Sequence, residues 1–242
     1  TMKRRTLIAR VIGAFAFGSA VSPYGNADVF DAKRTQFVEE RLSFVRNERV
    51  KDAFRKVRRE AFCLPDQRNH AYEDRPLPIG LGQTISQPSL VAYMTDALEL
   101  SGDEKVLEIG TGSGFQAAIL AELTPHVFSI EILGTLADRA RDTLRAEGYQ
   151  SVQIRTGDGY LGWPEEAPFD AIILTAAPRN VPQALLDQLR PGTGRLLVPE
   201  GPQGPEGQML KLYRKRLDGG SDVESLLAVR FVPMVHGRRG KQ

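Results

Sequence analysis

Apolar side chains in the first quarter of the sequence recur every three or four positions, which is the spacing of one helical face. The pattern predicts two amphipathic helices, over residues ~32–46 and ~50–59. Prolines and glycines then crowd residues 64–88 and interrupt any regular element. Because this segment also carries Ile79 and Ile85, we expect a long ordered loop rather than a disordered one.

After residue 89, short apolar runs alternate with amphipathic segments. Strands are predicted over 105–109, 126–131, 152–155, 171–175 and 194–198, with late strands over 208–214 and 224–232. Helices are predicted over 90–100, 116–123, 136–147 and 183–189. Such alternation is typical of parallel βαβ units. The sequence therefore predicts an α/β protein with a doubly wound, mostly parallel sheet and an N-terminal helical cap.

The first 27 residues have the three-part layout of a secretory signal peptide. A positive start from Lys3 to Arg5 precedes an apolar stretch, and small residues follow it. We predict from this pattern export to the periplasm. The alternative, a cytoplasmic protein whose N-terminal helix packs on the domain, stays open. The predicted division is a signal-like segment (1–27) and one domain (28–242), made of helices and a loop (28–88) and the sheet with its late strands (89–242).

The composition is that of an ordinary globular protein, with 41% hydrophobic and 26% charged residues and a net charge of +2. Residues 1–60 carry 14 Lys and Arg against 7 Asp and Glu, but in the predicted helices the two signs alternate. Alternation suits a solvated helix surface better than a phosphate-binding stripe. No apolar run approaches the ~18 residues of a membrane span. We therefore expect no nucleic-acid partner, no stable membrane association and a monomer.

Cysteine and histidine offer little chemistry in this sequence. The single cysteine, Cys63, excludes an intramolecular disulfide. The three histidines, His70, His126 and His236, lie far apart and lack metal-ligand spacing. We therefore predict no metal site.

A glycine-rich loop, Gly110-Thr-Gly-Ser-Gly114, follows the first strand of the alternating part. Glycines at this point let backbone amides approach a ligand at the N-terminus of the next helix. The dinucleotide fingerprint requires glycine where this sequence has Phe115, and the Gly-Lys-Ser/Thr of a P-loop does not follow. The spacing therefore disfavours a nicotinamide cofactor and excludes a P-loop.

Acidic residues stand at or near the carboxyl ends of three successive strands: Glu108, Glu131 and Asp158. At this edge of a doubly wound sheet, carboxylates can accept hydrogen bonds from ribose hydroxyls or an adenine amino group. We assign the amino-acid moiety of an adenosyl ligand to Glu108, its ribose to Glu131 and its adenine to Asp158. The predicted ligand is S-adenosylmethionine, and its predicted binding residues are Glu108, Gly110, Thr111, Gly112, Ser113, Gly114, Glu131, Ile132, Asp158, Gly159 and Thr175.

Residues 35–236 resemble the protein-L-isoaspartate (D-aspartate) O-methyltransferase family. The most specific string is Gly82-Gln-Thr-Ile-Ser-Gln-Pro88, because many methyltransferases share the glycine loop. The resemblance implies a Rossmann-like S-adenosylmethionine-dependent methyltransferase fold. The other strings that carry it are Tyr72-Glu-Asp-Arg-Pro-Leu-Pro-Ile-Gly80, Val106-Leu-Glu-Ile-Gly-Thr-Gly-Ser-Gly114, Gly157-Asp-Gly159, Trp163-Pro164, Ala167-Pro-Phe-Asp170, Thr175-Ala-Ala-Pro178 and Phe231-Val-Pro233.

The resemblance implies methyl transfer from S-adenosylmethionine to the free carboxylate of L-isoaspartyl residues in damaged proteins and peptides, and a cytoplasmic location. A sulfonium is already a good leaving group and a carboxylate already a nucleophile, so catalysis should rest on alignment. The resemblance makes Ser86 the catalytic residue and places Thr84, Ile85 and Val235 beside it at the substrate. A different interpretation of Ser86 is that its hydroxyl caps the helix after Pro88.

Two other functions stay open at this point. The first is a small-molecule or nucleic-acid methyltransferase that uses the same ligand. Amino-methylating nucleic-acid enzymes usually carry an Asn/Asp-Pro-Pro-aromatic string after the fourth strand, where this sequence has Thr175-Ala-Ala-Pro178. The second is an exported binding protein of the same fold without turnover. Leu81 and Ser89 depart from the residues of many bacterial relatives, which leaves the substrate side less defined.

Overall fold

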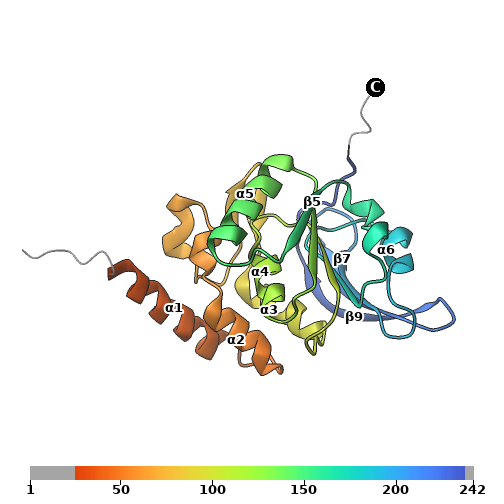
Figure 1. The fold of residues 1–242 in the computed structure, drawn as a ribbon, viewed down its shortest axis with the longest axis horizontal. Helices are drawn as coiled ribbons and strands as arrows, with labels where there is room; N and C mark the ends of the chain where they lie inside the picture. Colours follow the sequence, from red (N-terminus) through yellow and green to blue (C-terminus); the bar gives the residue numbers. More distant parts are fainter. Residues whose placement is uncertain (1–24, 238–242) are drawn as a thin grey trace, which may run out of the picture.

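A seven-stranded sheet runs through the structure, a computed structural model that describes residues 25–237 (Figure 1). The strand order is β5-β4-β3-β6-β7-β8-β9; the first five strands are parallel, and β8 and β9 are antiparallel. This confirms the predicted doubly wound, mostly parallel α/β fold. The strands are β3 (Val106–Ile109), β4 (Val127–Glu131), β5 (Gln153–Thr156), β6 (Ala171–Leu174), β7 (Arg195–Glu200), β8 (Gln208–Lys215) and β9 (Ser221–Val229).

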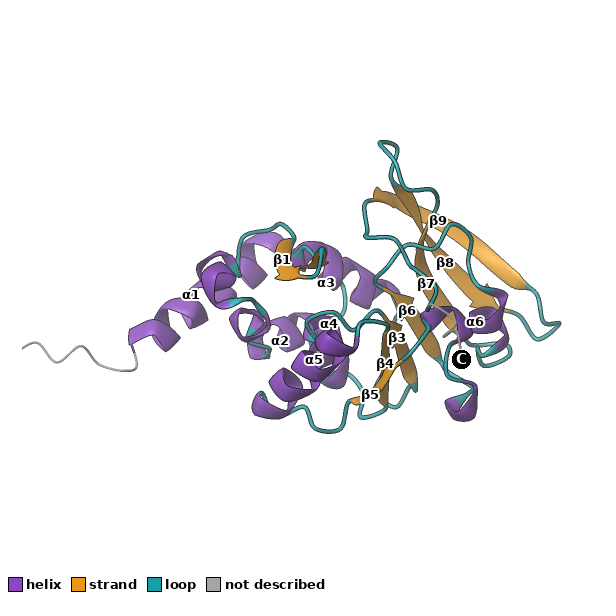
Figure 2. Cartoon of the chain, turned by 90° about the horizontal axis from the view of Figure 1, so that it is seen from above, coloured by secondary structure: helices purple, strands orange, loops and turns teal. Residues whose placement is uncertain are grey.

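Helices cover both faces of this sheet (Figure 2). One face packs against α3 (Pro88–Ala97), α4 (Phe115–Ala121) and α5 (Gly134–Ala146), and the other against the short α6 (Gln183–Asp187). Every residue of β3, β4 and β6 is buried. Burial on both faces explains why these strands are nearly continuous apolar runs in the sequence.

The chain changes direction across the sheet at β3. The strand β4 pairs with one edge of β3, and β6 pairs with the other. In an open α/β sheet, such a switch point leaves a crevice outside the carboxyl ends of the strands. The glycine loop at residues 110–114 begins immediately after β3, so the topology places it at this crevice.

The N-terminal helices differ in their bounds from the predicted ones. The first, α1 (Gly25–Arg41), begins earlier and ends before residue 46. The second, α2 (Glu48–Lys56), begins where the Asn47 side chain accepts a hydrogen bond from Arg49 N at 3.0 Å. This cap starts the second predicted helix. The apolar spacing of α1 continues past its end to the buried Leu42 and Val45, which lie in the connection between the two helices.

The prediction of a loop over residues 64–88 was wrong. Residues Pro65–His70 form a 3₁₀ helix, and β1 (Leu77–Gly80) pairs with β2 (Gln83–Ile85) as an antiparallel hairpin. Buried and exposed residues alternate along β1, which is the burial pattern of a strand. The turn needs left-handed backbone, which Gly80 and Gly82 adopt without strain. Here the glycines that suggested a loop make the hairpin turn.

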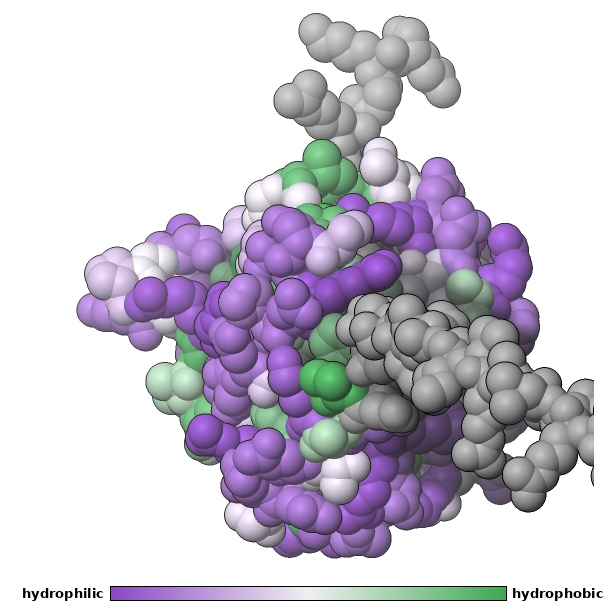
Figure 3. All heavy atoms as spheres, turned by 90° about the vertical axis from the view of Figure 1, so that its left-hand side faces the viewer, coloured by the Kyte–Doolittle hydropathy of each residue, from purple (hydrophilic) through white to green (hydrophobic). Residues whose placement is uncertain are grey.

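The outer parts of the chain give further corrections. The strand β9 begins three residues before the predicted start and ends before residue 232. The predicted segment 1–27 lies outside the described residues except for 25–27, which belong to α1, so the divisions at 27 and 88 stay predictions. No helix in the described part is long and apolar enough to cross a membrane. The face in Figure 3 is mostly hydrophilic, with hydrophobic residues in small groups.

Candidate active site

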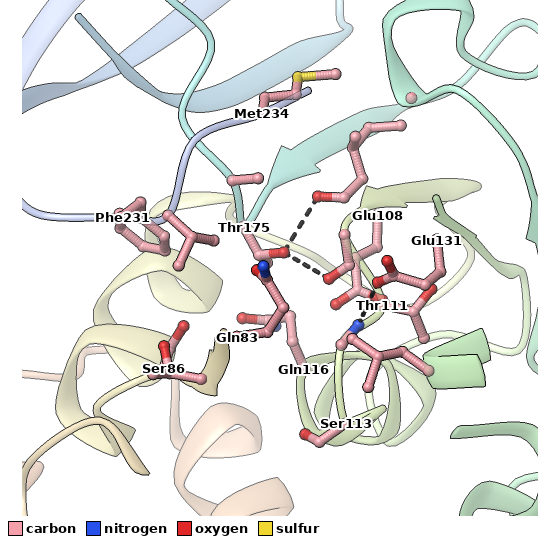
Figure 4. A pocket seen from close by; sticks show the side chains of 18 of the residues that line it. Gln83, Ser86, Glu108, Thr111, Ser113, Gln116, Glu131, Thr175, Phe231 and Met234 are labelled. Carbon is pink, nitrogen blue, oxygen red and sulfur yellow. Dashed lines mark hydrogen bonds between the residues drawn. The ribbon is translucent and has the colours of Figure 1, made fainter. Parts of the chain in front are cut away.

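A cavity of about 250 Å³ lies at the carboxyl ends of the central strands (Figure 4). Its wall comes from β2 and the residues after it, the glycine loop, the ends of β4 and β6, and the C-terminal segment 231–235. Residues of α3, α4 and α5 and Gly159 complete it. In the view of Figure 4, Ser86 lies on one side of the cavity and Glu108, Thr111 and Glu131 lie on the other, with Gln83 between them. Segments far apart in the sequence therefore build one site.

Most of the predicted site residues line this cavity. Gly114 does not line it: it has a φ of 91° and is the N-cap residue before α4 (Phe115–Ala121). A Cβ there would lie 3.2 Å from Leu144, so this glycine serves the turn and its packing. The predicted residues that line the cavity are Thr84, Ile85, Ser86, Glu108, Gly110, Thr111, Gly112, Ser113, Glu131, Ile132, Gly159, Thr175 and Val235.

Asp158 is the other predicted residue outside the cavity lining. Its Oδ1 accepts a hydrogen bond from Tyr160 N at 2.9 Å. Its Oδ2 accepts one from Gly237 N at 3.0 Å and lies 3.3 Å from His236 Nδ1. The carboxylate is therefore engaged by the C-terminal segment, and its assignment to adenine stays a prediction.

The glycine loop is held against the end of β6. The Thr175 hydroxyl donates to the carbonyl oxygen of Gly110 at 2.6 Å. A Cβ on Gly110 would lie only 2.5 Å from that hydroxyl, and the φ of Gly110 is +103°. Both the close approach and the backbone conformation therefore require glycine at this position.

Glu108 is a fully buried carboxylate in the cavity wall. Its Oε2 accepts a hydrogen bond from the Ser129 hydroxyl at 2.5 Å, and Ser129 lies 2.6 Å from the Thr111 hydroxyl. Within residues 25–237, Oε1 has no hydrogen-bond partner. Burial raises the pKa of Glu108 to about 8. An unpaired buried acceptor is costly, so this site favours a ligand that brings a positive donor.

Glu131 is oriented by backbone amides at the end of β4. Its Oε2 accepts from Gly112 N at 2.8 Å, and its Oε1 accepts from Leu133 N at 3.0 Å. Each carboxylate oxygen can accept more than one hydrogen bond, so capacity remains for a ligand with two hydroxyl groups. The amides hold the carboxylate in place before any ligand binds.

These features fit the adenosyl ligand that the sequence predicts. Glu108 has, among residues 25–237, an unpaired oxygen that an ammonium group could occupy, and Glu131 has acceptor capacity that ribose hydroxyls could use. Gly110 and Gly159 keep the wall open, because a Cβ on Gly159 would lie 2.4 Å from Ile109 Cγ2. Both the carboxylates and the space that the glycines leave therefore fit an adenosyl ligand.

The substrate side of the cavity is built by β2 and the turn into α3. Ile85 is buried, whereas Thr84 is exposed and Ser86 is half-buried. At the start of α3, Asp74 Oδ1 accepts the hydrogen bond from Ser89 N at 3.0 Å. Asp74 thus fills the capping role considered for Ser86, which leaves the Ser86 hydroxyl for the cavity.

Sequence reasoning missed several residues of the cavity wall. Gln83 stands beside the named Thr84, so the same string could have identified it. The C-terminal segment reaches the cavity because Ala177 N donates to Val232 O at 2.8 Å and Met234 N donates to Ala177 O at 2.9 Å. No local sequence pattern predicts this pairing. The missed wall residues include Gln83, Met94, Gln116, Leu133, Phe231 and Met234.

The chain is similar to known proteins over most of its length. Residues 33–239 match the family model described as protein-L-isoaspartate(D-aspartate) O-methyltransferase. A protein-L-isoaspartate O-methyltransferase of Myxococcus xanthus is 53% identical over 191 residues, covering 78% of this chain and 90% of that protein. Protein-L-isoaspartate O-methyltransferase 2 of Syntrophobacter fumaroxidans is 46% identical over 240 residues, covering 96% and 95%.

Solved structures with a similar fold carry the same description. One protein-L-isoaspartate O-methyltransferase has a TM-score of 0.73 and 28% identity, and the match covers 83% of this chain but 65% of that one. A Plasmodium falciparum protein described by the same activity, in complex with S-adenosyl-L-homocysteine, has a TM-score of 0.72. It is 21% identical, covers 84% and 98%, and shows the fold alone. The family-model match and the relatives at about half identity show that this chain belongs to the protein-L-isoaspartate (D-aspartate) O-methyltransferase family.

Proposed function

We propose that this chain is a protein repair enzyme that methylates the free carboxylate of L-isoaspartyl residues in damaged proteins and peptides. The observation that carries the proposal is the cavity itself, which brings Ser86 and the acidic ligand site of Glu108 and Glu131 together. Family membership supports the substrate class. The adjacent backbone amide nitrogen of the substrate then attacks the ester and expels methanol, and the succinimide formed hydrolyses in part to normal aspartate.

One group of residues binds the ligand, and another binds the substrate. Glu108 pairs with an ammonium group, Glu131 accepts from ribose hydroxyls, and the loop after β3 packs along the ligand. S-adenosylmethionine supplies, when bound, a methyl group activated by the attached sulfonium. The Ser86 hydroxyl donates a hydrogen bond to the substrate carboxylate and keeps it from rotating away. No general base is needed because the carboxylate is already ionised, so positioning is the main contribution.

A methyl-transfer assay tests this proposal. The protein is incubated with S-adenosylmethionine labelled in its methyl group and with an isoaspartyl peptide, beside the same peptide with normal aspartate. We expect labelled ester on the isoaspartyl peptide alone. Label on neither peptide contradicts the proposal. Binding of S-adenosyl-L-homocysteine is measured in parallel by calorimetry. If the protein binds it but labels neither peptide, it is another methyltransferase or a binding protein; if it does not bind, the preparation is inactive.

We further propose that the protein acts as a monomer without a nucleic-acid partner. Basic residues of α2 are paired with carboxylates, since Arg55 Nη1 lies 2.8 Å from Glu48 and 2.7 Å from Asp52, and Lys56 Nζ lies 2.8 Å from Glu122. Paired charges leave little net field for phosphates. Light scattering after gel filtration tests the monomer, and a gel-shift assay at low salt tests nucleic-acid binding. A dimer mass or a shifted band contradicts the respective part.

The location of the protein bears on its activity, because S-adenosylmethionine is a cytoplasmic metabolite. We propose that the segment 1–27 decides between the two locations. N-terminal sequencing of the protein from its native cell gives the answer directly. A start near residue 28 supports export, and an intact start supports a cytoplasmic enzyme.

A further inference from the structure

Ser86 lies in a short connection, and its position depends on what holds the two sides of that connection. On its N-terminal side, Ile85 pairs with Leu77 in the β1–β2 hairpin. On its C-terminal side, Gln87 and Pro88 lead into α3. The hairpin fixes the first side through backbone pairing, so the second side needs its own anchor.

Asp74 provides that anchor with both oxygens of its carboxylate. Its Oδ1 accepts from Ser89 N at 3.0 Å, and its Oδ2 accepts from Gln87 Nε2 at 3.1 Å. Gln87 Nε2 also lies 3.0 Å from the Ser89 hydroxyl. A helix cap requires only the first of these bonds. The second bond holds the side chain of the residue immediately after Ser86.

The segment that carries Asp74 is tied to the wall of the cavity. Three residues before Asp74, the carbonyl oxygen of Ala71 accepts from Arg59 Nε at 2.7 Å. The guanidinium carbon of the buried Arg59 lies 5.0 Å from the ring centre of Phe115, which lines the cavity. The segment that holds Asp74 is therefore linked, through Ala71 and Arg59, to Phe115 at the start of α4. In this way Asp74 connects the turn at Ser86 with the cavity wall next to the glycine loop.

We propose that Asp74 is a positioning residue for the reaction: through Gln87 and Ser89 it sets the place of the Ser86 hydroxyl against the ligand. This inference rests on the proposed function. It predicts that the hydrogen bond from Gln87 to Asp74 affects kcat, whereas the bond from Ser89 N, which caps the helix, affects mainly stability.

The substitution Asp74→Asn tests this hydrogen bond with almost no change of shape. With Gln87 oriented as in the structure, the new amide can accept from only one of Ser89 N and Gln87 Nε2. To pair with it, the Gln87 amide must turn over and reverse its hydrogen bond with the Ser89 hydroxyl, which changes the connection beside Ser86. We expect kcat to fall about 10-fold, the factor that follows from the loss of roughly one hydrogen bond to a charged group. The affinity for S-adenosyl-L-homocysteine should stay within about 2-fold, because that side is untouched.

The reversed pair Asp74→Asn with Gln87→Glu restores a hydrogen bond between the two side chains. The amide of residue 74 then donates to the new carboxylate, and the Ser89 hydroxyl can donate to it as well. We expect the double variant to regain most of the lost kcat, although each single variant is slow. Asp66→Asn, an exposed acid on the neighbouring 3₁₀ helix, is the matched control and should keep full activity.

The outcomes separate the hypotheses. Wild-type protein that methylates no isoaspartyl peptide overturns the proposed function and, with it, the role of Asp74 in that reaction. If the wild type is active, an Asp74→Asn variant with unchanged kcat overturns the positioning role. A double variant that regains melting temperature but not kcat overturns it too, because the bond would then serve stability alone.

Discussion

The two sides of the cavity are built in different ways. The ligand side comes from the ends of β3, β4 and β6, whose residues are all buried and paired in one parallel sheet. The substrate side comes from a hairpin, a turn and the C-terminal segment, which side chains and a few backbone bonds hold in place. On the ligand side, substitutions that change shape or burial should therefore be the most damaging. On the substrate side, substitutions that remove a hydrogen bond should be the most damaging. The predictions below test this contrast.

The largest effect is expected on the ligand side, at Gly110. Gly110→Ala places a methyl group 2.5 Å from the Thr175 hydroxyl on a backbone with φ +103°. Strain and displacement of the loop should weaken S-adenosyl-L-homocysteine binding by about 100-fold, measured by calorimetry. Gly148→Ala is the control, since its φ is +91° and no atom of the described part of the chain lies within 4 Å of the new Cβ. Equal losses in both variants would mean that strain alone, and not the ligand site, is responsible.

Ser86→Ala tests the substrate side. Loss of a hydrogen bond to a charged carboxylate should slow turnover by roughly 10- to 100-fold in the methyl-transfer assay. Ligand binding should stay as in the wild type, because Ser86 lies across the cavity from Glu108. The exposed Ser151→Ala serves as control. Unchanged kinetics would remove Ser86 from the mechanism.

Glu108→Gln should separate binding from stability. The folded pKa of Glu108, about 8, lies above its ordinary value of 4.5, so the wild-type protein without ligand loses stability as pH rises between these values. The neutral amide removes this loss and should raise the melting temperature at pH 8 by at least ~2 °C, with no gain at pH 4.5.

The same variant should bind S-adenosyl-L-homocysteine about 10-fold more weakly, because the ligand's ammonium group loses its charged partner. Thermal melts at both pH values and calorimetry measure the two effects. A variant that is less stable at pH 8 and binds normally would contradict both the burial argument and the assignment of Glu108.

The smallest effect is expected at the C-terminal segment. The His236 ring stacks on Tyr160 at 3.8 Å and touches Asp158, but the side chain is exposed. Exposed polar contacts contribute little, so His236→Ala should change KM for the peptide by less than ~3-fold. The backbone pairing of Ala177 with Val232 and Met234 keeps the segment in place. A change in KM above 10-fold would show that this ring belongs to the substrate side.

Prediction from the sequence succeeded where neighbouring residues carry the information. Apolar runs flanked by turns identified the parallel strands, and the glycine spacing identified the ligand loop, because both patterns are local. It failed at residues 64–88, where glycines at a hairpin turn and glycines in a loop give the same signal. The predicted helix end near residue 46 was too late, since α1 ends at Arg41 although the buried Leu42 and Val45 continue its apolar spacing.

The sequence by itself determined the α/β class, the place of the glycine loop and the family. These depend on short strings whose physical meaning holds wherever they fold. Only the tertiary structure decided that Asp74 caps α3 in place of Ser86 and that the C-terminal segment engages Asp158. It also decided that one oxygen of Glu108 stays unpaired among residues 25–237. Each of these contacts joins residues 15 or more positions apart or depends on burial by the whole core, and no local pattern specifies such partners.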